Sequence, residues 1–381
     1  MINRLNYYYL FSNEVYLFKD SLPDSNKKHN ILLGIIMQIL TAFCVIGTSI
    51  IYKEKCKINP KLLGVSRSQT GIDALRKIYS DDINILSDLG LRKPMSRYLS
   101  FRKVLKVSVF SVKDALTVLL KMYHDNTISA KVYNYYLFRL VHTYNYYYSL
   151  YYITIDANLD YMYSSQIVDR YAFLEKEITR CLNMKRICIP HGLEPLIKLP
   201  NVFPADVFYC HSAAACNYLS ELYGKSCFEF SDEVVRRLMS FNKKNKTRNR
   251  IVFFTQPHSS NMTEKTIEYL KYLLKYVEQS KFYSELCVKF HPADNKEYYM
   301  EKLGDINVLT DLSDAVSSSV CISFFSTCLL EAIYNNSVSI SIYEKSLDIP
   351  LCEVSINPNI IKVSNKEELY KILDEYSFRQ S

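Results

Sequence analysis

Short apolar runs alternate along most of this chain with longer stretches in which apolar residues recur every three or four positions. Runs of the first kind are typical of buried strands, and stretches of the second kind are typical of amphipathic helices. Their regular alternation predicts an α/β protein in which helices cover parallel sheets. In the second half we expect strands over residues 250–254, 287–290, 307–309, 320–325, 338–343 and 360–363, and helices over 263–279, 312–317 and 366–376.

The first half follows the same alternation less evenly. Strands are expected over residues 31–35, 106–110, 149–155, 186–189 and 205–210, helices from residue 37 and over 112–123, 168–182 and 213–223, and short helices and loops over 53–100. Residues 31–51 also form an uncharged apolar run of the length that crosses a bilayer. Its glycines and polar residues, among them Gln38, fit a buried strand, turn and helix equally well, so both interpretations stay open.

Composition changes between residues 232 and 250, where charged residues dominate. A chain of 381 residues is long for a single core, and this segment, with its run Lys243-Lys244-Asn245-Lys246, is predicted to link two domains. The expected order is an N-terminal extension over 1–29, a Rossmann-like N-terminal domain over 30–235, a linker over 236–249 and a Rossmann-like C-terminal domain over 250–381.

Composition and net charge limit the kinds of ligand-binding site that we expect in this chain. The eight glycines are scattered and form no Gly-rich phosphate loop, so a bound nucleotide would be held by side chains and helix N-termini. The eleven cysteines include no C-x-x-C pair, which favours reduced thiols in a cytosolic protein and argues against a metal site formed by cysteines. A net charge of +8 suits an anionic substrate or the headgroups of a cytoplasmic leaflet. Nucleic acid is not expected, because no dense basic block interleaved with aromatic residues occurs.

Polar pairs follow two predicted strands of the second half. His291-Pro292 ends one strand, and Ser326-Thr327 ends another just before an apolar, helix-like segment. Since ligands of an open parallel sheet collect at the carboxyl ends of its strands, both pairs would point into one crevice. An imidazole, two hydroxyls and the N–H groups of a helix N-terminus together favour a phosphate. The alternative is structural: the His caps one loop, and the Ser/Thr pair caps the next helix.

Three of these sequence features resemble the bacterial sialyltransferases, which are glycosyltransferases of GT-B fold, with two Rossmann-like domains facing a central cleft. The segments Val288-Lys289-Phe290-His291-Pro292 and Ser323-Phe324-Phe325-Ser326-Thr327 are similar to the His-Pro and Ser-Ser/Thr motifs that hold the CMP moiety of CMP-sialic acid. Residues 30–42, with Gln38 in their helix, look like the opening strand, turn and helix of family 52, the lipooligosaccharide sialyltransferases.

The acidic motif of those families supplies a general base, and here it is incomplete. Its place falls at residues 155–161, where Asp156 would end a strand and Asn158 stands for the usual Gly. Asn tolerates a left-handed backbone, so the turn could be kept. Asp156 is therefore the expected base, with Asp160 and His191 as the alternatives. The motif Pro190-His191-Gly192 also resembles the CDP-glycerol glycerophosphotransferases, which likewise release a cytidylate.

The resemblance implies an inverting transfer of sialic acid, or a related ulosonate, from a CMP-sugar to a hydroxyl of a surface glycan such as lipooligosaccharide or capsule. His291 would donate to the departing phosphate and act with Asp156 in catalysis. Pro292, Ser326, Thr327, Gln256 and Ser259 would complete the donor site, with His258 beside them, and no metal or other cofactor is required.

The alternatives are a glycerophosphotransferase and a non-catalytic nucleotide-sugar-binding relative. The first residues lack the basic region and cleavage site of a signal peptide, so a cytoplasmic location is expected. The expected partners are the donor, a glycan or glycolipid acceptor, and the inner-membrane surface as a peripheral contact.

Overall fold

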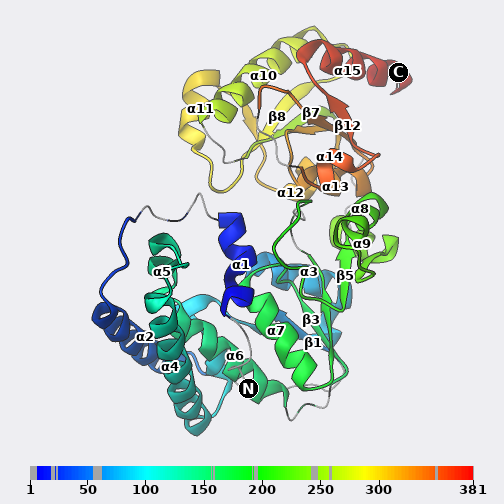
Figure 1. The fold of residues 1–381 in the computed structure, drawn as a ribbon. Coiled ribbons are helices and arrows are strands. Elements are labelled where there is room, and N and C mark those ends of the chain that lie inside the picture. The colour runs from blue at the N-terminus through cyan, green and yellow to red at the C-terminus, as the bar shows by residue number, and fades with distance from the viewer. Residues whose placement is uncertain are drawn as a thin grey trace. The chain divides into compact units, whose positions relative to one another are not determined.

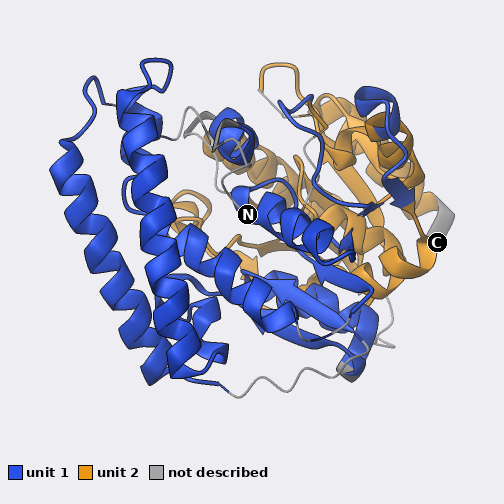
Figure 2. Cartoon of the chain, turned by 60° about the horizontal axis from the view of Figure 1, so that its bottom comes forward, with its two compact units in different colours: residues 1–191, 198–209, 220–229 blue, residues 192–197, 210–219, 230–381 orange. Residues whose placement is uncertain are grey.

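The chain folds into two compact units. The computed structural model describes residues 7–18, 22, 25–54, 62–155, 157, 159–190, 192, 196–241, 248–256, 260–347 and 351–380. Unit 1 comprises residues 1–191, 198–209 and 220–229, and unit 2 comprises residues 192–197, 210–219 and 230–381 (Figure 2). Two six-stranded sheets, with helices between their strands, confirm the predicted α/β class (Figure 1).

The first sheet has the order β2-β1-β3-β4-β5-β6 and belongs to unit 1, apart from the last residues of β5 and β6. The neighbouring strands from β2 to β5 are parallel. The strands are β1 (Leu63–Ser66), β2 (Asn84–Ser87), β3 (Tyr161–Ser164), β4 (Lys185–Cys188), β5 (Val207–Cys210) and β6 (Phe228–Phe230). The helices are α1 (Tyr7–Phe18), α2 (Ile31–Ile51), α3 (Gln69–Tyr79), α4 (Phe101–His124), α5 (Ala130–Tyr136), α6 (Leu140–Thr154) and α7 (Arg170–Cys181), with short 3-10 helices at η2 (Ser80–Asp82), η3 (Gly90–Arg92) and η4 (Met95–Tyr98). Helix α8 (Ala213–Tyr223) is shared, since residues 213–219 belong to unit 2 and residues 220–223 to unit 1.

The second sheet lies in unit 2, has the order β12-β11-β10-β7-β8-β9 and is parallel throughout. Its strands are β7 (Arg248–Phe254), β8 (Glu285–Lys289), β9 (Asn307–Val308), β10 (Ser318–Ser323), β11 (Val338–Ile342) and β12 (Ile361–Val363). The helices are α9 (Asp232–Met239), α10 (Ser260–Gln279), α11 (Lys296–Leu303), α12 (Leu312–Ala315), α13 (Cys328–Tyr334), α14 (Glu353–Ile356) and α15 (Lys366–Gln380). Every strand expected here is present, because the buried strands read as short apolar runs that helices with one apolar face separate.

Three predicted strands of the first half are wrong, because their residues are helical. Residues 31–35 begin α2, residues 106–110 lie within α4, and residues 149–154 end α6. In α6 nearly every side chain is buried, so the helix carries no polar face from which its period could be read. The alternating pattern of residues 106–110 has a different origin, since Val107 is buried whereas Val109 is exposed on the opposite side of α4.

The opening of the chain is therefore not the strand, turn and helix that the family resemblance implied. One unbroken helix, α2, covers the whole segment from Ile31 to Ile51. Asn30 begins it, since the Asn30 side chain accepts a hydrogen bond of 2.8 Å from the Leu32 N–H group.

The expected linker is partly helical. Helix α9 ends at Met239 and belongs to unit 2, where the Asn335 side-chain amide donates to the Met239 carbonyl at 3.0 Å. The same side chain accepts from the Phe241 N–H group at 2.9 Å. Residues 230–239 thus pack with the C-terminal sheet and its helices, whereas residues 242–247 lie outside the described part of the chain.

Close packing brings α3 onto the carboxyl ends of β1 and β3. A Cβ atom on Gly71, in the first turn of α3, would lie 2.2 Å from the Ser165 hydroxyl oxygen and 2.4 Å from that of Ser66. Those two hydroxyls bond to each other at 2.8 Å. Only a glycine at position 71 allows α3 to approach these two strand ends so closely.

Candidate active site

The carboxyl ends of three neighbouring strands bring predicted donor-site residues together in unit 2. Strand β7 lies between β8 and β10, with Phe253 opposite both Val288 and Ile322. The loops that carry Gln256, His291 and Ser326 consequently leave the sheet at one edge. The sequence predicted this grouping from the strand pattern alone, and the strand order supports it.

The His291 side chain is exposed, and its ring Nδ1 atom is hydrogen-bonded within its own loop. The ring Nδ1 accepts a hydrogen bond of 3.1 Å from the Ala293 N–H group, so in the neutral ring the proton sits on Nε2. The His291 N–H group donates to the Thr255 hydroxyl at 3.0 Å, which anchors the loop to the end of β7. The Nε2–H group is thus a donor available to a ligand. Pro292, which follows, is also exposed.

Gln256 holds the loop after β10. Its side-chain amide donates to the Phe325 carbonyl at 2.9 Å and accepts from the Phe325 N–H group at 3.4 Å. This pair fixes the backbone immediately before Ser326. Gln256 therefore supports the edge through the backbone, which is a different task from the direct nucleotide contact predicted for it.

Ser326 and Thr327 begin α13 in different ways. The buried Ser326 hydroxyl accepts a hydrogen bond of 3.3 Å from the Cys328 N–H group, and the next two N–H groups bond to the carbonyls of Ser326 and Thr327. The first turn of α13 thus uses its own N–H groups, which is the structural alternative considered for this pair. The Thr327 side chain is half-buried and makes no capping bond, so its hydroxyl is the more available of the two.

Two further predicted residues, Asp160 and Gln38, belong to unit 1. Asp160 directly precedes β3 and is exposed at the amino end of that strand, opposite to the edge at which the strands finish. Gln38 is fully buried; its side chain bonds to the Leu137 carbonyl and accepts from the Val141 N–H group at 2.9 Å, so it joins α2 to the start of α6.

Three of the predicted site residues and His258 lie outside the described part of the chain. The three are Asp156, His191 and Ser259. The strand that was expected to end at Asp156 is the helix α6, so the stated reason for placing a base there is wrong.

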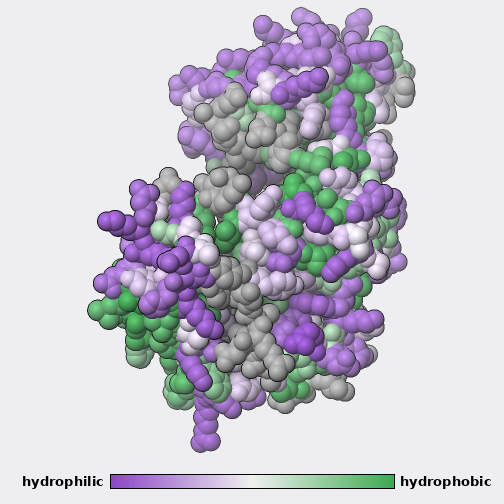
Figure 3. Space-filling view, in the orientation of Figure 1, coloured by the Kyte–Doolittle hydropathy of each residue, from purple (hydrophilic) through white to green (hydrophobic). Residues whose placement is uncertain are grey.

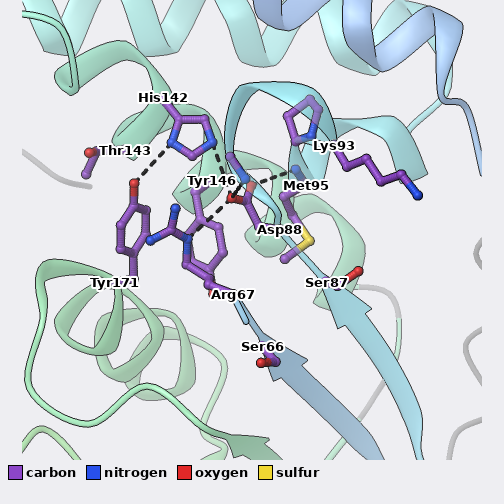
Figure 4. Close-up of polar contacts among 12 residues, drawn as sticks. Ser66, Arg67, Ser87, Asp88, Lys93, Met95, His142, Thr143, Tyr146 and Tyr171 are labelled. Carbon is purple, nitrogen blue, oxygen red and sulfur yellow. Dashed lines mark hydrogen bonds and ion pairs between the residues drawn. The ribbon is translucent and has the colours of Figure 1, made fainter. Parts of the chain in front are cut away.

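A second polar cluster, which the sequence analysis missed, lies at the carboxyl edge of unit 1 (Figure 4). Arg67 directly follows β1, Asp88 follows β2, His142 comes from α6 and Tyr171 from α7. The Asp88 carboxylate lies 3.3 Å from the Arg67 Nε and 3.2 Å from the His142 Nε2, and it accepts the Met95 N–H group at 2.8 Å. We call these four side chains, Arg67, Asp88, His142 and Tyr171, the Arg67 cluster.

Charge pairing dominates the protonation of the Arg67 cluster. Burial alone would raise the pKa of Asp88, but the neighbouring His142 and Arg67 charges lower it to about 2. Burial would lower the pKa of His142, yet the Asp88 carboxylate raises it to about 9. Burial alone would raise the pKa of Tyr171. The positive charges of Arg170, His142 and Arg67 outweigh that effect and lower the pKa of Tyr171 to about 8. At neutral pH the Asp88–His142 pair is ionised on both sides.

Arg67 is the open part of the cluster. Its guanidinium carbon lies 3.4 Å from the centre of the Tyr171 ring, its Nε is held by Asp88, and its side chain is 20% exposed. Within the described part of the chain its two terminal nitrogens bond to no acceptor. A guanidinium fixed on one side, with its planar fork unoccupied, is suited to a carboxylate or phosphate.

Among the described residues, no group of three or more His, Cys, Asp and Glu side chains could hold a metal ion.

Comparison with known proteins places the fold but not the family. No protein-family model matches the sequence, and no curated protein matches it. The chain is similar to the solved structure of a UDP-GlcNAc 2-epimerase from Methanocaldococcus jannaschii, with 10% identity, 82% of this chain and 92% of that chain covered, and a TM-score of 0.51. It is also similar to that of a putative UDP-N-acetylglucosamine 2-epimerase from Listeria monocytogenes, with 12% identity, 83% and 88% covered, and a TM-score of 0.50. Together with the two parallel sheets, these similarities show that the chain has a GT-B fold built from two Rossmann-like domains, as the sequence predicted.

Proposed function

We propose that this protein is a glycosyltransferase that takes a sugar from a CMP-linked donor, most readily CMP-sialic acid or a related ulosonate, and transfers it with inversion to a hydroxyl of a surface glycan. The observation that carries the proposal is the meeting of His291, Gln256 and Ser326 at one carboxyl edge of a GT-B fold. A loop held by two hydrogen bonds carries the exposed His291 there, and its Nε2–H group would donate to a phosphate of the donor.

The donor half of the reaction needs stabilisation of a departing phosphate. The Nε2–H group of His291 would donate to a phosphate oxygen of CMP, and the Thr327 hydroxyl would add a second donor. Gln256 would keep the loop after β10 in place through its two bonds to Phe325. In this proposal the protein supplies these donors itself, and the reaction requires no metal.

At the carboxyl edge of unit 1, Arg67 presents a planar fork that can bind a carboxylate or a phosphate bidentately. The Asp88–His142 pair is unsuited to be the base, because the Asp88 pKa is about 2 and the His142 pKa about 9, which leaves one a weak base and the other protonated at neutral pH. Asp156 remains the proposed base.

The first test is a donor screen by thermal stability. CMP should raise the melting temperature of the protein more than CDP, UDP or GDP does, since a ligand stabilises the fold in proportion to the logarithm of its concentration over its Kd. Incubation with CMP-sialic acid and a galactose-terminated acceptor should then release CMP. A preference for UDP, without CMP binding, would contradict the proposal.

A paired substitution separates ligand binding from loop structure at position 291. The His291→Asn side chain can still accept the Ala293 N–H group through its Oδ1, as in an Asx turn, but it lacks the outward Nε2–H donor. This variant should keep the wild-type melting temperature and lose at least about tenfold in CMP affinity. The control His29→Ala removes an exposed imidazole elsewhere and should change neither quantity. Unchanged CMP affinity in His291→Asn would make the residue purely structural.

Other activities have their own readouts. The names of the two similar structures raise a UDP-GlcNAc 2-epimerase as the second candidate, and conversion of UDP-GlcNAc without any acceptor would support it. Turnover of CDP-glycerol but of no CMP-ulosonate would favour the glycerophosphotransferase. CMP binding without hydrolysis or transfer would favour a non-catalytic relative.

A further inference from the structure

Helix α2 exposes its large apolar side chains and buries its small and polar ones, which is the reverse of a surface helix in a soluble protein. Its buried face consists mainly of small and polar residues: Gly34, Gln38, Thr41, Ala42, Val45 and Ser49. Its outward face carries large aliphatic and aromatic side chains, each at least 46% exposed: Leu32, Ile36, Leu40, Phe43, Ile50 and Ile51. A helix on a water-facing surface has the opposite distribution.

Specific contacts hold α2 in this orientation. A Cβ atom on Gly34 would lie 2.9 Å from a methyl carbon of Leu119, so the glycine lets α2 approach α4 closely. At the other end, the Ser49 and Ser96 hydroxyls bond at 2.7 Å, and Gln38 bonds to the backbone at the start of α6. Small residues and polar side chains of this kind join helices whose outer faces contact lipid. The apolar side of α2 is therefore fixed outward.

Helix α4 packs beside α2 and extends the same apolar surface. Phe101, Leu105 and Val109 recur at four-residue spacing and are exposed, Val109 by 67%. Figure 3 shows hydrophobic surface in the area where Figure 1 draws α2 and α4. We call the outward side chains of the two helices the α2–α4 surface.

The charges on the α2–α4 surface are nearly all positive. Helix α2 has no charged residue, whereas α4 carries five basic residues, Arg102, Lys103, Lys106, Lys113 and Lys121, and one acidic residue, Asp114, which gives a net charge of +4. The Asp114 carboxylate is occupied by the Tyr148 hydroxyl at 2.5 Å. An apolar centre beside a basic helix matches the acyl region and the phosphate headgroups of an anionic membrane.

We infer that the α2–α4 surface binds the interface of a lipid bilayer that contains anionic lipids. A second copy of the chain is disfavoured as the occupant, because pairing two such surfaces would bring two basic helices together. Among the described residues α2 alone has the length and hydropathy of a membrane-crossing helix. It lies in the interface and does not cross, since α4 beside it would otherwise carry Lys106 and Lys113 into hydrocarbon.

The test is flotation of the full-length protein with vesicles of phosphatidylcholine alone or mixed in equal amounts with phosphatidylglycerol. The wild type should float with the mixed vesicles and at least about tenfold less with phosphatidylcholine alone, because each basic residue near an anionic surface contributes to binding. The triple variant Ile36→Ser, Leu40→Ser, Phe43→Ser should lose at least about tenfold of the partitioning. Since all three side chains are exposed, its melting temperature should match that of the wild type.

Two matched controls accompany these variants. Phe378→Ser removes an exposed aromatic from unit 2 and should float as the wild type does. The pair Lys106→Glu, Lys113→Glu should abolish the preference for phosphatidylglycerol, whereas Lys271→Glu, an exposed reversal on α10, should reduce it little.

Three outcomes would overturn the inference. The first is equal flotation of the triple variant and the wild type, or none by either. The second is a wild-type dimer in vesicle-free buffer that the triple variant turns into a monomer, since a second copy would then cover the surface. The third is retention in the membrane after alkaline carbonate treatment, which would mean that α2 crosses the bilayer. None of these measurements depends on catalysis, so membrane binding is tested independently of the proposed enzyme activity.

Discussion

The two carboxyl edges present their polar groups in opposite ways. At the edge of unit 2 the key side chain, His291, is exposed and is held by hydrogen bonds to its own loop. At the edge of unit 1 the Arg67 cluster is mostly buried, and ion pairs with a fully buried carboxylate hold it. When backbone hydrogen bonds hold a site, its ligand-binding atom can be removed and the protein stays folded. When buried ion pairs hold a site, removal of one charged group leaves its partners buried without a counter-charge, which destabilises the fold.

Removal of the central carboxylate should show the contrast most strongly. Asp88→Ala leaves His142 and Arg67 without their shared counter-charge in a buried place, and we expect the free energy of unfolding to fall by about 3–5 kcal/mol. Urea denaturation measures this directly. The control Asp305→Ala removes an exposed carboxylate and should stay within about 0.5 kcal/mol of the wild type. A loss below about 1 kcal/mol for Asp88→Ala would show that the cluster is not the charged network described here.

The pH dependence of stability should also separate the two edges. The folded-state pKa of His142 is raised from 6.5 to about 9, so its stabilising effect is complete below pH 6.5 and is lost as the pH rises through about 9. Between pH 6.5 and 8 the free energy of unfolding should fall by roughly 2 kcal/mol. Above pH 8 the lowered pKa of Tyr171, about 8, opposes the fall, because the folded state then releases a proton that the unfolded state keeps. The variant His142→Gln should flatten the curve between pH 6.5 and 8. The variant His291→Asn should leave it unchanged, and an equal slope in wild type and His142→Gln would refute the assignment.

The smallest expected effect sharpens the role of Arg67. Arg67→Lys keeps the positive charge but loses the planar fork and its stacking on Tyr171. We expect a stability loss near 1 kcal/mol and a loss of at least about tenfold in the affinity for inorganic phosphate. Urea denaturation and calorimetric titration with phosphate would measure the two quantities. An unchanged phosphate affinity would confine Arg67 to a structural role.

The sequence predicted the strands of unit 2 well and those of unit 1 only in part. Strands β7 to β12 are short apolar runs between helices that show one apolar face, so their period could be read. In the N-terminal unit the signal failed for physical reasons. Helix α6 is buried on almost all sides, and α2 exposes its large side chains, so neither has the usual amphipathic pattern.

The same division holds for the candidate sites. His291-Pro292 and Ser326-Thr327 directly follow strands that could be predicted, so their grouping could be predicted with them. Arg67, Asp88 and His142 are far apart in sequence, and β1 and β2 were read as part of a region of short helices and loops. The signal that could have found two of them is the short, mainly apolar segment before each, residues 62–65 before Arg67 and residues 83–86, which include Asn84, before Asp88.

The inverted helix α2 has a consequence for synthesis. The ribosome releases residues 31–51 well before α4 and α6, whose side chains cover the inner face of α2 in the finished protein. For that interval the nascent chain holds a long apolar segment with none of its later packing partners available, which is the condition under which growing chains aggregate or recruit a chaperone. Expression of this protein should therefore depend on what meets α2 at the ribosome before the rest of unit 1 has been made.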